Sequence, residues 1–117
     1  MTYDAFDVVV VPFPFTDQPV SRKRPAVILS SRQAYGDPTG HCVIAMITAA
    51  TRSNWPFDRP IVDPDSAGLR KPSVVRMKLF TVDQQLIRSK VGRLGDKDRR
   101  VVSEAIRGLF GPMFVGE

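Results

Sequence analysis

The sequence has only one cysteine and one histidine in 117 residues. The lone Cys42 excludes an intramolecular disulfide and the cysteine-rich zinc sites, which need two or more thiolates at short spacing. His41 stands beside it, but neighbouring residues on a strand point to opposite faces, so the pair would not converge on a metal. We therefore expect no metal and no other cofactor, with Cys42 as a small core residue and His41 in a loop.

Long apolar runs and a basic N-terminal targeting segment are also missing. The longest apolar stretch, residues 8–15, is far too short to cross a bilayer. The first residues carry two acids, Asp4 and Asp7, where a secretory signal has basic residues. The sequence therefore predicts a cytoplasmic protein with no membrane partner.

The length and the charge distribution narrow the possibilities further. A chain of 117 residues with 43% apolar and 25% charged residues predicts a single globular domain over residues 1–117. Residues 70–107 hold eleven Lys and Arg against four Asp and Glu, whereas the rest of the chain is slightly acidic. This local excess favours a polyanion as partner, although Arg99, Arg100 and Arg107 fit a solvated helix face.

Short apolar segments separated by Pro and Gly turns predict a mainly β fold, a compact antiparallel barrel. The third segment is apolar at nearly every position, so it is either covered on both faces or part of a dimer seam. A helical stripe with Asp96 as its cap closes the chain. The expected strands are residues 7–13, 25–30, 42–48, 59–62, 73–77, 79–81 and 90–94, and the helix follows over residues 96–110.

Three groups of residues stand in a fixed order along the chain. They are DVVVVPFPFTD (7–17) with KRPAVILS (23–30), then AMIT (45–48) with TRS (51–53), then KPSVVR (71–76) with KLFTVD (78–83). In this order and spacing they resemble the MazF/PemK family of toxin–antitoxin ribonucleases, over nearly the whole chain.

The resemblance implies an SH3-like barrel of the MazF/PemK/CcdB type with a C-terminal helix. It also implies a homodimer and a cognate antitoxin whose tail occupies the RNA groove. The implied activity is metal-independent cleavage of single-stranded RNA, with messenger RNA as the expected target, which inhibits translation and growth. The products are a 2′,3′-cyclic phosphate and a 5′-hydroxyl.

Carried over residue by residue, the resemblance assigns Arg24 and Thr48 as catalytic residues. The segment 16–23 matches a mobile loop near the substrate. Beyond the resemblance, several cations could follow the RNA backbone, and Trp55 could either stack a base or plug the space under a loop. The candidate RNA-binding residues are Thr16, Arg22, Lys23, Thr51, Arg52, Trp55, Arg76 and Lys78.

The residues themselves limit the chemistry. Cleavage by a ribose 2′-OH needs a proton acceptor, stabilisation of the phosphorane charge and a proton donor, and one histidine cannot serve a two-histidine mechanism. Arg24 suits charge stabilisation, since its planar donors grip phosphate oxygens, but it is a poor acid or base. Thr48 can orient the 2′-OH. The proton acceptor stays open, and water is one candidate.

Two departures from the family pattern keep alternatives open. In the family the first strand usually begins with glycine. Phe6 occupies that position here, which affects the turn before the strand. Met77 and Lys78 follow Arg76, where some relatives have an acid with a proton-transfer role. The missing acid leaves a catalytically idle RNA-binding barrel as one alternative function. A gyrase-inhibiting toxin of the CcdB type, which resembles this fold, is the other, and Arg24 and Thr48 argue against it.

Overall fold

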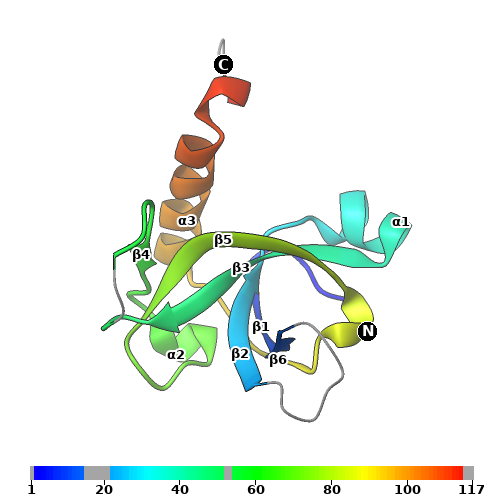
Figure 1. Cartoon of the computed structure of the whole chain (residues 1–117), viewed down its shortest axis with the longest axis horizontal. Helices are drawn as coiled ribbons and strands as arrows, with labels where there is room; N and C mark the ends of the chain where they lie inside the picture. The colour runs from blue at the N-terminus through cyan, green and yellow to red at the C-terminus, as the bar shows by residue number, and fades with distance from the viewer. Residues whose placement is uncertain (1, 15–21, 52–53, 115–117) are drawn as a thin grey trace.

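The protein is seen in a computed structural model that describes residues 2–14, 22–51 and 54–114. Six antiparallel strands form one curled sheet, a half-barrel, in the order β4-β5-β3-β2-β1-β6 (Figure 1). The strands are β1 (Asp7–Phe13), β2 (Arg22–Ile28), β3 (His41–Ala49), β4 (Arg59–Pro60), β5 (Ser73–Asp83) and β6 (Ser89–Arg93). The predicted mainly β fold with a C-terminal helix is confirmed.

The helical segments are short except for one helix of 14 residues near the C-terminus. The predicted turn before β3 contains η1 (Arg32–Gly36) and α1 (Asp37–Thr39), and α2 (Pro64–Ala67) is a turn of helix that the sequence analysis missed. The others are η2 (Gln84–Leu86), α3 (Asp96–Leu109) and η3 (Gly111–Phe114). The N-cap of α3 is Gly95 rather than the predicted Asp96, which is the first helical residue. No helix among the described residues is long and apolar enough to cross a membrane.

The apolar strand β3 lies in the middle of the sheet, between β2 and β5. Ala45 and Ile47 pack on one face, in the cluster that also contains Val102 of α3. Ile44 and Met46 pack on the other face, in a second buried cluster. The apolar composition of β3 is thus explained by cover from its own chain on both faces, without a dimer seam.

Several strand boundaries differ from the expectation, and one difference matters for the site. β2 begins at Arg22 and not at residue 25, so three basic residues expected in or beside a loop lie on a strand. Residues 73–83 form the single strand β5 instead of two, and β4 covers only two residues. His41, expected in a loop, is the first residue of β3.

The segment that enters β5 is held in place by α2. Asp63 caps this helix by accepting a hydrogen bond from the Ser66 N–H, and Gly68 ends it in the left-handed conformation, with φ 73°. A Cβ on Gly68 would lie 2.1 Å from the carbonyl oxygen of Val91, so only glycine fits there without rearrangement. This close packing against β6 fixes the start of the 69–72 loop.

Candidate active site

Arg24 and Thr48 lie together because of the strand register. The ladder between β2 and β3 covers three residue pairs and ends at Ala26 and Met46. Two residues further in the same register, Arg24 stands opposite Thr48. Each remains paired on its outer side, Arg24 with Val11 of β1 and Thr48 with a residue of β5. The sheet is therefore split between β2 and β3 at the two predicted catalytic residues.

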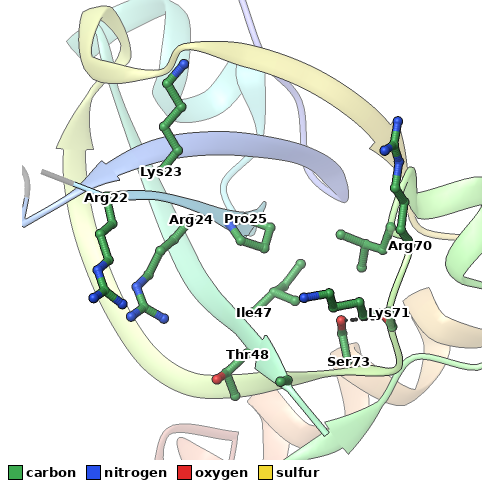
Figure 2. Close-up of a pocket in the computed structure, with 11 residues that line it drawn as sticks. Arg22, Lys23, Arg24, Pro25, Ile47, Thr48, Arg70, Lys71 and Ser73 are labelled. Carbon is green, nitrogen blue, oxygen red and sulfur yellow. Dashed lines mark hydrogen bonds between the residues drawn. The ribbon is translucent and has the colours of Figure 1, made fainter.

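Two cavities open at this split, and both are lined by Arg24, Ile47 and Thr48. The first cavity, of about 420 Å³, extends toward the loop before β5 (Figure 2). The second cavity, of about 190 Å³, extends toward the middle of β5. A ligand that crosses the split would therefore contact Arg24 and Thr48 from either side.

The first cavity is lined by cations from two separate parts of the chain. Arg22 and Lys23 come from β2, and Arg70 and Lys71 come from the loop after α2. In Figure 2, Arg22 and Arg24 project to the same side of β2, while the side chain of Lys23 projects to the other side. None of the described residues that line this cavity is an acid, so the site suits an anion.

The second cavity owes its shape to a bulge in β5. Ala45 of β3 pairs with Leu79 and Ile47 pairs with Val75, so three residues of β5, 76–78, lie opposite the single residue Met46. Bulges of this kind redirect side chains and are frequent beside functional sites. Here the bulge brings Arg76 and Lys78 to the cavity that Arg24 and Thr48 line.

The guanidinium of Arg24 is held by its surroundings but is not fully hydrogen-bonded. It lies 5.7 Å from the centre of the Phe13 ring, within the range of a cation–π contact. Its Nε atom is buried and has no hydrogen-bond acceptor among the residues that the structure describes. A buried donor without an acceptor costs about 1–3 kcal/mol, so an incoming anionic oxygen would relieve this cost.

The other predicted site residues fall into three groups. Arg22 and Lys23 line the first cavity, and Arg76 and Lys78 line the second. Thr51 is exposed beyond the end of β3. Trp55 is not among the residues that line the second cavity, but the guanidinium of Arg76, which does line it, lies 5.6 Å from the centre of the indole ring. The remaining two candidates, Thr16 and Arg52, lie outside the described residues.

Sequence reasoning assigned no role to Arg70 and Lys71 individually, although both belong to the basic excess. The alternation of side chains also places Phe13 at the site, since it follows Val9 and Val11 on the same face of β1. Much of the remaining basic excess lies elsewhere: Lys90 and Arg93 pair with the buried Asp7.

The groups available for proton transfer are few. The described residues that line the two cavities include no carboxylate, histidine or cysteine. His41 lies seven residues before Thr48 on β3, about 23 Å away at a rise of roughly 3.3 Å per residue. Cys42 is buried, and burial, with a smaller effect of the Asp7 charge, raises the pKa of its thiol, so it is a poor nucleophile. The site is thus equipped to bind and polarise an anion and to orient a hydroxyl.

The sequence matches one family profile over residues 4–110, described as PemK-like, MazF-like toxin of type II toxin-antitoxin system. The chain belongs to this family. The match contains all three ordered groups of residues, together with Arg24 and Thr48, so the MazF/PemK resemblance is confirmed. A comparison with curated protein sequences gives no match.

Solved structures of MazF toxins share the fold of this family member. MazE-MazF (form III) from Deinococcus radiodurans is 22% identical, with a TM-score of 0.74 over 95% of this chain and 98% of that chain. The Mycobacterium tuberculosis toxin MazF-mt6 is 21% identical, with a TM-score of 0.69 over 90% and 96%. An endoribonuclease in complex with its cognate antitoxin, from a mycobacterial species, is 16% identical, with a TM-score of 0.68 over 93% and 95%. At sequence identities this low, the structural similarity shows the common fold alone.

This MazF/PemK-family toxin keeps the two departures noted in its sequence. Phe6 has a φ of 74°, in the left-handed region that favours the glycine usual at this position, and its side chain packs against the core beside α3. Arg76 has no acid after it, and it pairs instead with Asp58, with 2.9 Å between Nη2 and Oδ2. A carboxylate is therefore present near the site, but it is bound to an arginine.

Proposed function

We propose that this toxin is an endoribonuclease that cleaves single-stranded RNA, with messenger RNA as its target, without a metal ion. The observation that carries the proposal is the buried Nε–H of Arg24, a residue that lines a cation-rich cavity together with Thr48 at the split between β2 and β3. Among the described residues, no group of three or more His, Cys, Asp or Glu side chains could hold a metal ion. Stabilisation of charge by fixed donors is then the chemistry these residues can supply.

In the proposed reaction the ribose 2′-oxygen attacks the adjacent phosphorus while the bond to the 5′-oxygen breaks. The products are a 2′,3′-cyclic phosphate and a 5′-hydroxyl. Arg24 donates to the non-bridging oxygens, whose negative charge grows as the phosphorane forms. Thr48 orients the 2′-OH. A water molecule accepts the proton of the 2′-OH, because the described lining residues include no carboxylate, histidine or cysteine, and another water molecule protonates the leaving oxygen.

The biological role follows from the family and from the charge of the site. We propose that the toxin acts in the cytoplasm, inhibits translation and growth, and is neutralised by a cognate antitoxin. An acidic, partly disordered antitoxin segment would pair with Arg22, Arg70 and Lys71 and so block RNA.

We also propose that the toxin, acting as one domain over residues 1–117, forms a homodimer. Strand β3 does not support this dimer, because residues of the same chain cover both of its faces. Exposed apolar surface lies instead at the end of α3, where Phe110 is 39% and Met113 is 80% exposed. A second copy that covered these side chains would remove them from water.

The lack of an acid or histidine among the described lining residues favours an idle RNA-binding barrel as the second candidate function. Incubation of metal-free protein with a long RNA in EDTA separates the candidates. Cleavage supports the proposed enzyme, and retention of intact RNA supports the idle binder. Inhibition of gyrase supercoiling without any effect on RNA would instead support a CcdB-type toxin.

A further inference from the structure

Arg76 takes part in a compact stack beside the second cavity. Its Nε and Nη2 atoms donate to the two carboxylate oxygens of Asp58, at 3.2 and 2.9 Å. The same guanidinium lies over a face of the Trp55 indole, 5.6 Å from the centre of the ring. The two-point ion pair fixes the plane of the guanidinium, as bidentate arginine–carboxylate pairs do. Carboxylate, guanidinium and indole thus form one ordered unit, here called the Trp55 platform.

The backbone that carries the Trp55 platform is fixed from several sides. The turn is closed by a hydrogen bond from the Asp58 N–H to the Trp55 carbonyl, and the Trp55 N–H donates to Asp58 Oδ2. Phe57, inside the turn, has a φ of 66° and packs against α3 so closely that a Cβ on Gly108 would lie 2.8 Å from its ring. A platform held this way would lose little conformational entropy when a ligand binds.

The charge of Arg76 is already compensated by Asp58. The side chains of Arg76 and Asp58 are only 13% and 18% exposed. The hydrogen bonds that Arg76 donates to Asp58 raise the pKa of Arg76 above its usual value, so the arginine stays charged and paired. Lys78, which lines the same cavity, is exposed. The two cations predicted to follow the RNA backbone are therefore not equivalent, because only the lysine offers a charge for a phosphate.

The position of the platform indicates what it binds. Arg76 lines the second cavity with Phe13 and Met46, next to Arg24, and the Trp55 indole is 42% exposed. An uncharged aromatic face beside a phosphate site is suited to an unpaired nucleobase, since every base has a π-face that stacks on aromatic rings. A base stacked there would belong to a nucleotide that flanks the phosphate at Arg24.

We propose that Trp55, Arg76 and Asp58 form a charge-neutral platform that stacks one unpaired base next to the scissile phosphate. The inference rests on the proposed function, since it presupposes a single-stranded RNA substrate. It adds Asp58 as a positioning residue that holds Arg76 and Trp55 in the stacking geometry. It also replaces the expected contact of Arg76 with the RNA backbone by a contact with a base.

Trp55 is the only tryptophan in the sequence, so its fluorescence reports on the platform directly. The probe is a mixed-sequence 2′-O-methyl oligoribonucleotide, which lacks the attacking hydroxyl and carries a terminal dye for anisotropy. We expect quenching of tryptophan emission that saturates together with the anisotropy. Trp55→Ala should bind about 5- to 150-fold more weakly, the range for loss of one stacked base. Binding with unchanged tryptophan emission would overturn the platform but not the enzyme.

The salt dependence of binding separates a base contact from a phosphate contact. Each phosphate contact adds about 0.7 to the slope of log K against log salt for a single strand. We expect Lys78→Ala to lower this slope by about 0.7 and the double variant Asp58→Asn/Arg76→Gln, which keeps the net charge, to leave it unchanged. An equal fall in slope for both would show that Arg76 contacts phosphate. No anisotropy change with the wild-type toxin would instead overturn the proposed function.

Discussion

Replacement of Arg24 by lysine tests the site through activity and stability together. Lysine keeps the positive charge and an aliphatic stem beside Phe13, but it has no donor at the position of the buried Nε. In the wild type that N–H has no acceptor among the described residues, at a cost of about 1–3 kcal/mol. A phosphate oxygen that accepts it in the transition state recovers this free energy, which corresponds to roughly 5- to 150-fold in rate.

We therefore expect Arg24→Lys to cleave RNA roughly 5- to 150-fold more slowly while its melting temperature stays the same or rises. A gain of 1 kcal/mol would raise the melting temperature by about 4 °C in a domain of this size. The assay is cleavage of a dye-quencher RNA, with thermal unfolding on the same samples. Arg100→Lys, an exposed change on α3, is the matched control and should change neither quantity. Near-wild-type cleavage, or a loss of activity that follows a fall in melting temperature, would refute the reasoning.

Four other outcomes are expected. Thr48→Val should lose most of its cleavage rate and Thr48→Ser should keep most of it, because only serine retains the hydroxyl; equal rates would remove this group from the site. Cleavage should survive EDTA, and a loss that added Mg²⁺ or Zn²⁺ restores would contradict the mechanism. Light scattering at micromolar concentration should give twice 13.0 kDa, whereas a mass near 13.0 kDa would contradict the dimer. In urea unfolding, Gly40→Ala should cost about 1–2 kcal/mol for its φ of 73° alone. Gly68→Ala, with the same φ and a clash with Val91, should cost about 1–3 kcal/mol more, and equal costs would show that this packing yields easily.

The sequence predicted those parts of the fold that depend on local patterns. The apolar run at residues 7–13 is β1 at its predicted bounds, and the helical stripe near the end is α3. The resemblance singled out Arg24 and Thr48, and the strand register explains why residues 24 positions apart meet. Arg24 and Thr48 lie near each other because β2 begins at Arg22. The sequence did not indicate this start, because position 25 is a proline, which is normally a poor strand residue.

What the sequence did not predict depends on contacts between distant segments. Arg70 and Lys71 enter the first cavity only because α2 and the tight packing at Gly68 fix their loop. Arg76 was expected at the RNA backbone, since its pairing with Asp58, eighteen residues earlier, leaves no mark in a composition or a period. A count of charges cannot distinguish such a paired cation from an available one. The β5 bulge, which sets the second cavity, is equally invisible to side-chain patterns.

The chemistry of the RNA ends produced by the wild-type toxin tests the central proposal most directly. A single-stranded RNA is incubated with metal-free protein in EDTA, and both new ends are identified by mass spectrometry. Attack by the 2′-OH at Arg24 and Thr48 predicts a 2′,3′-cyclic phosphate on one fragment and a 5′-hydroxyl on the other. Fragments with a 5′-phosphate and a 3′-hydroxyl, or RNA that stays intact, would contradict it.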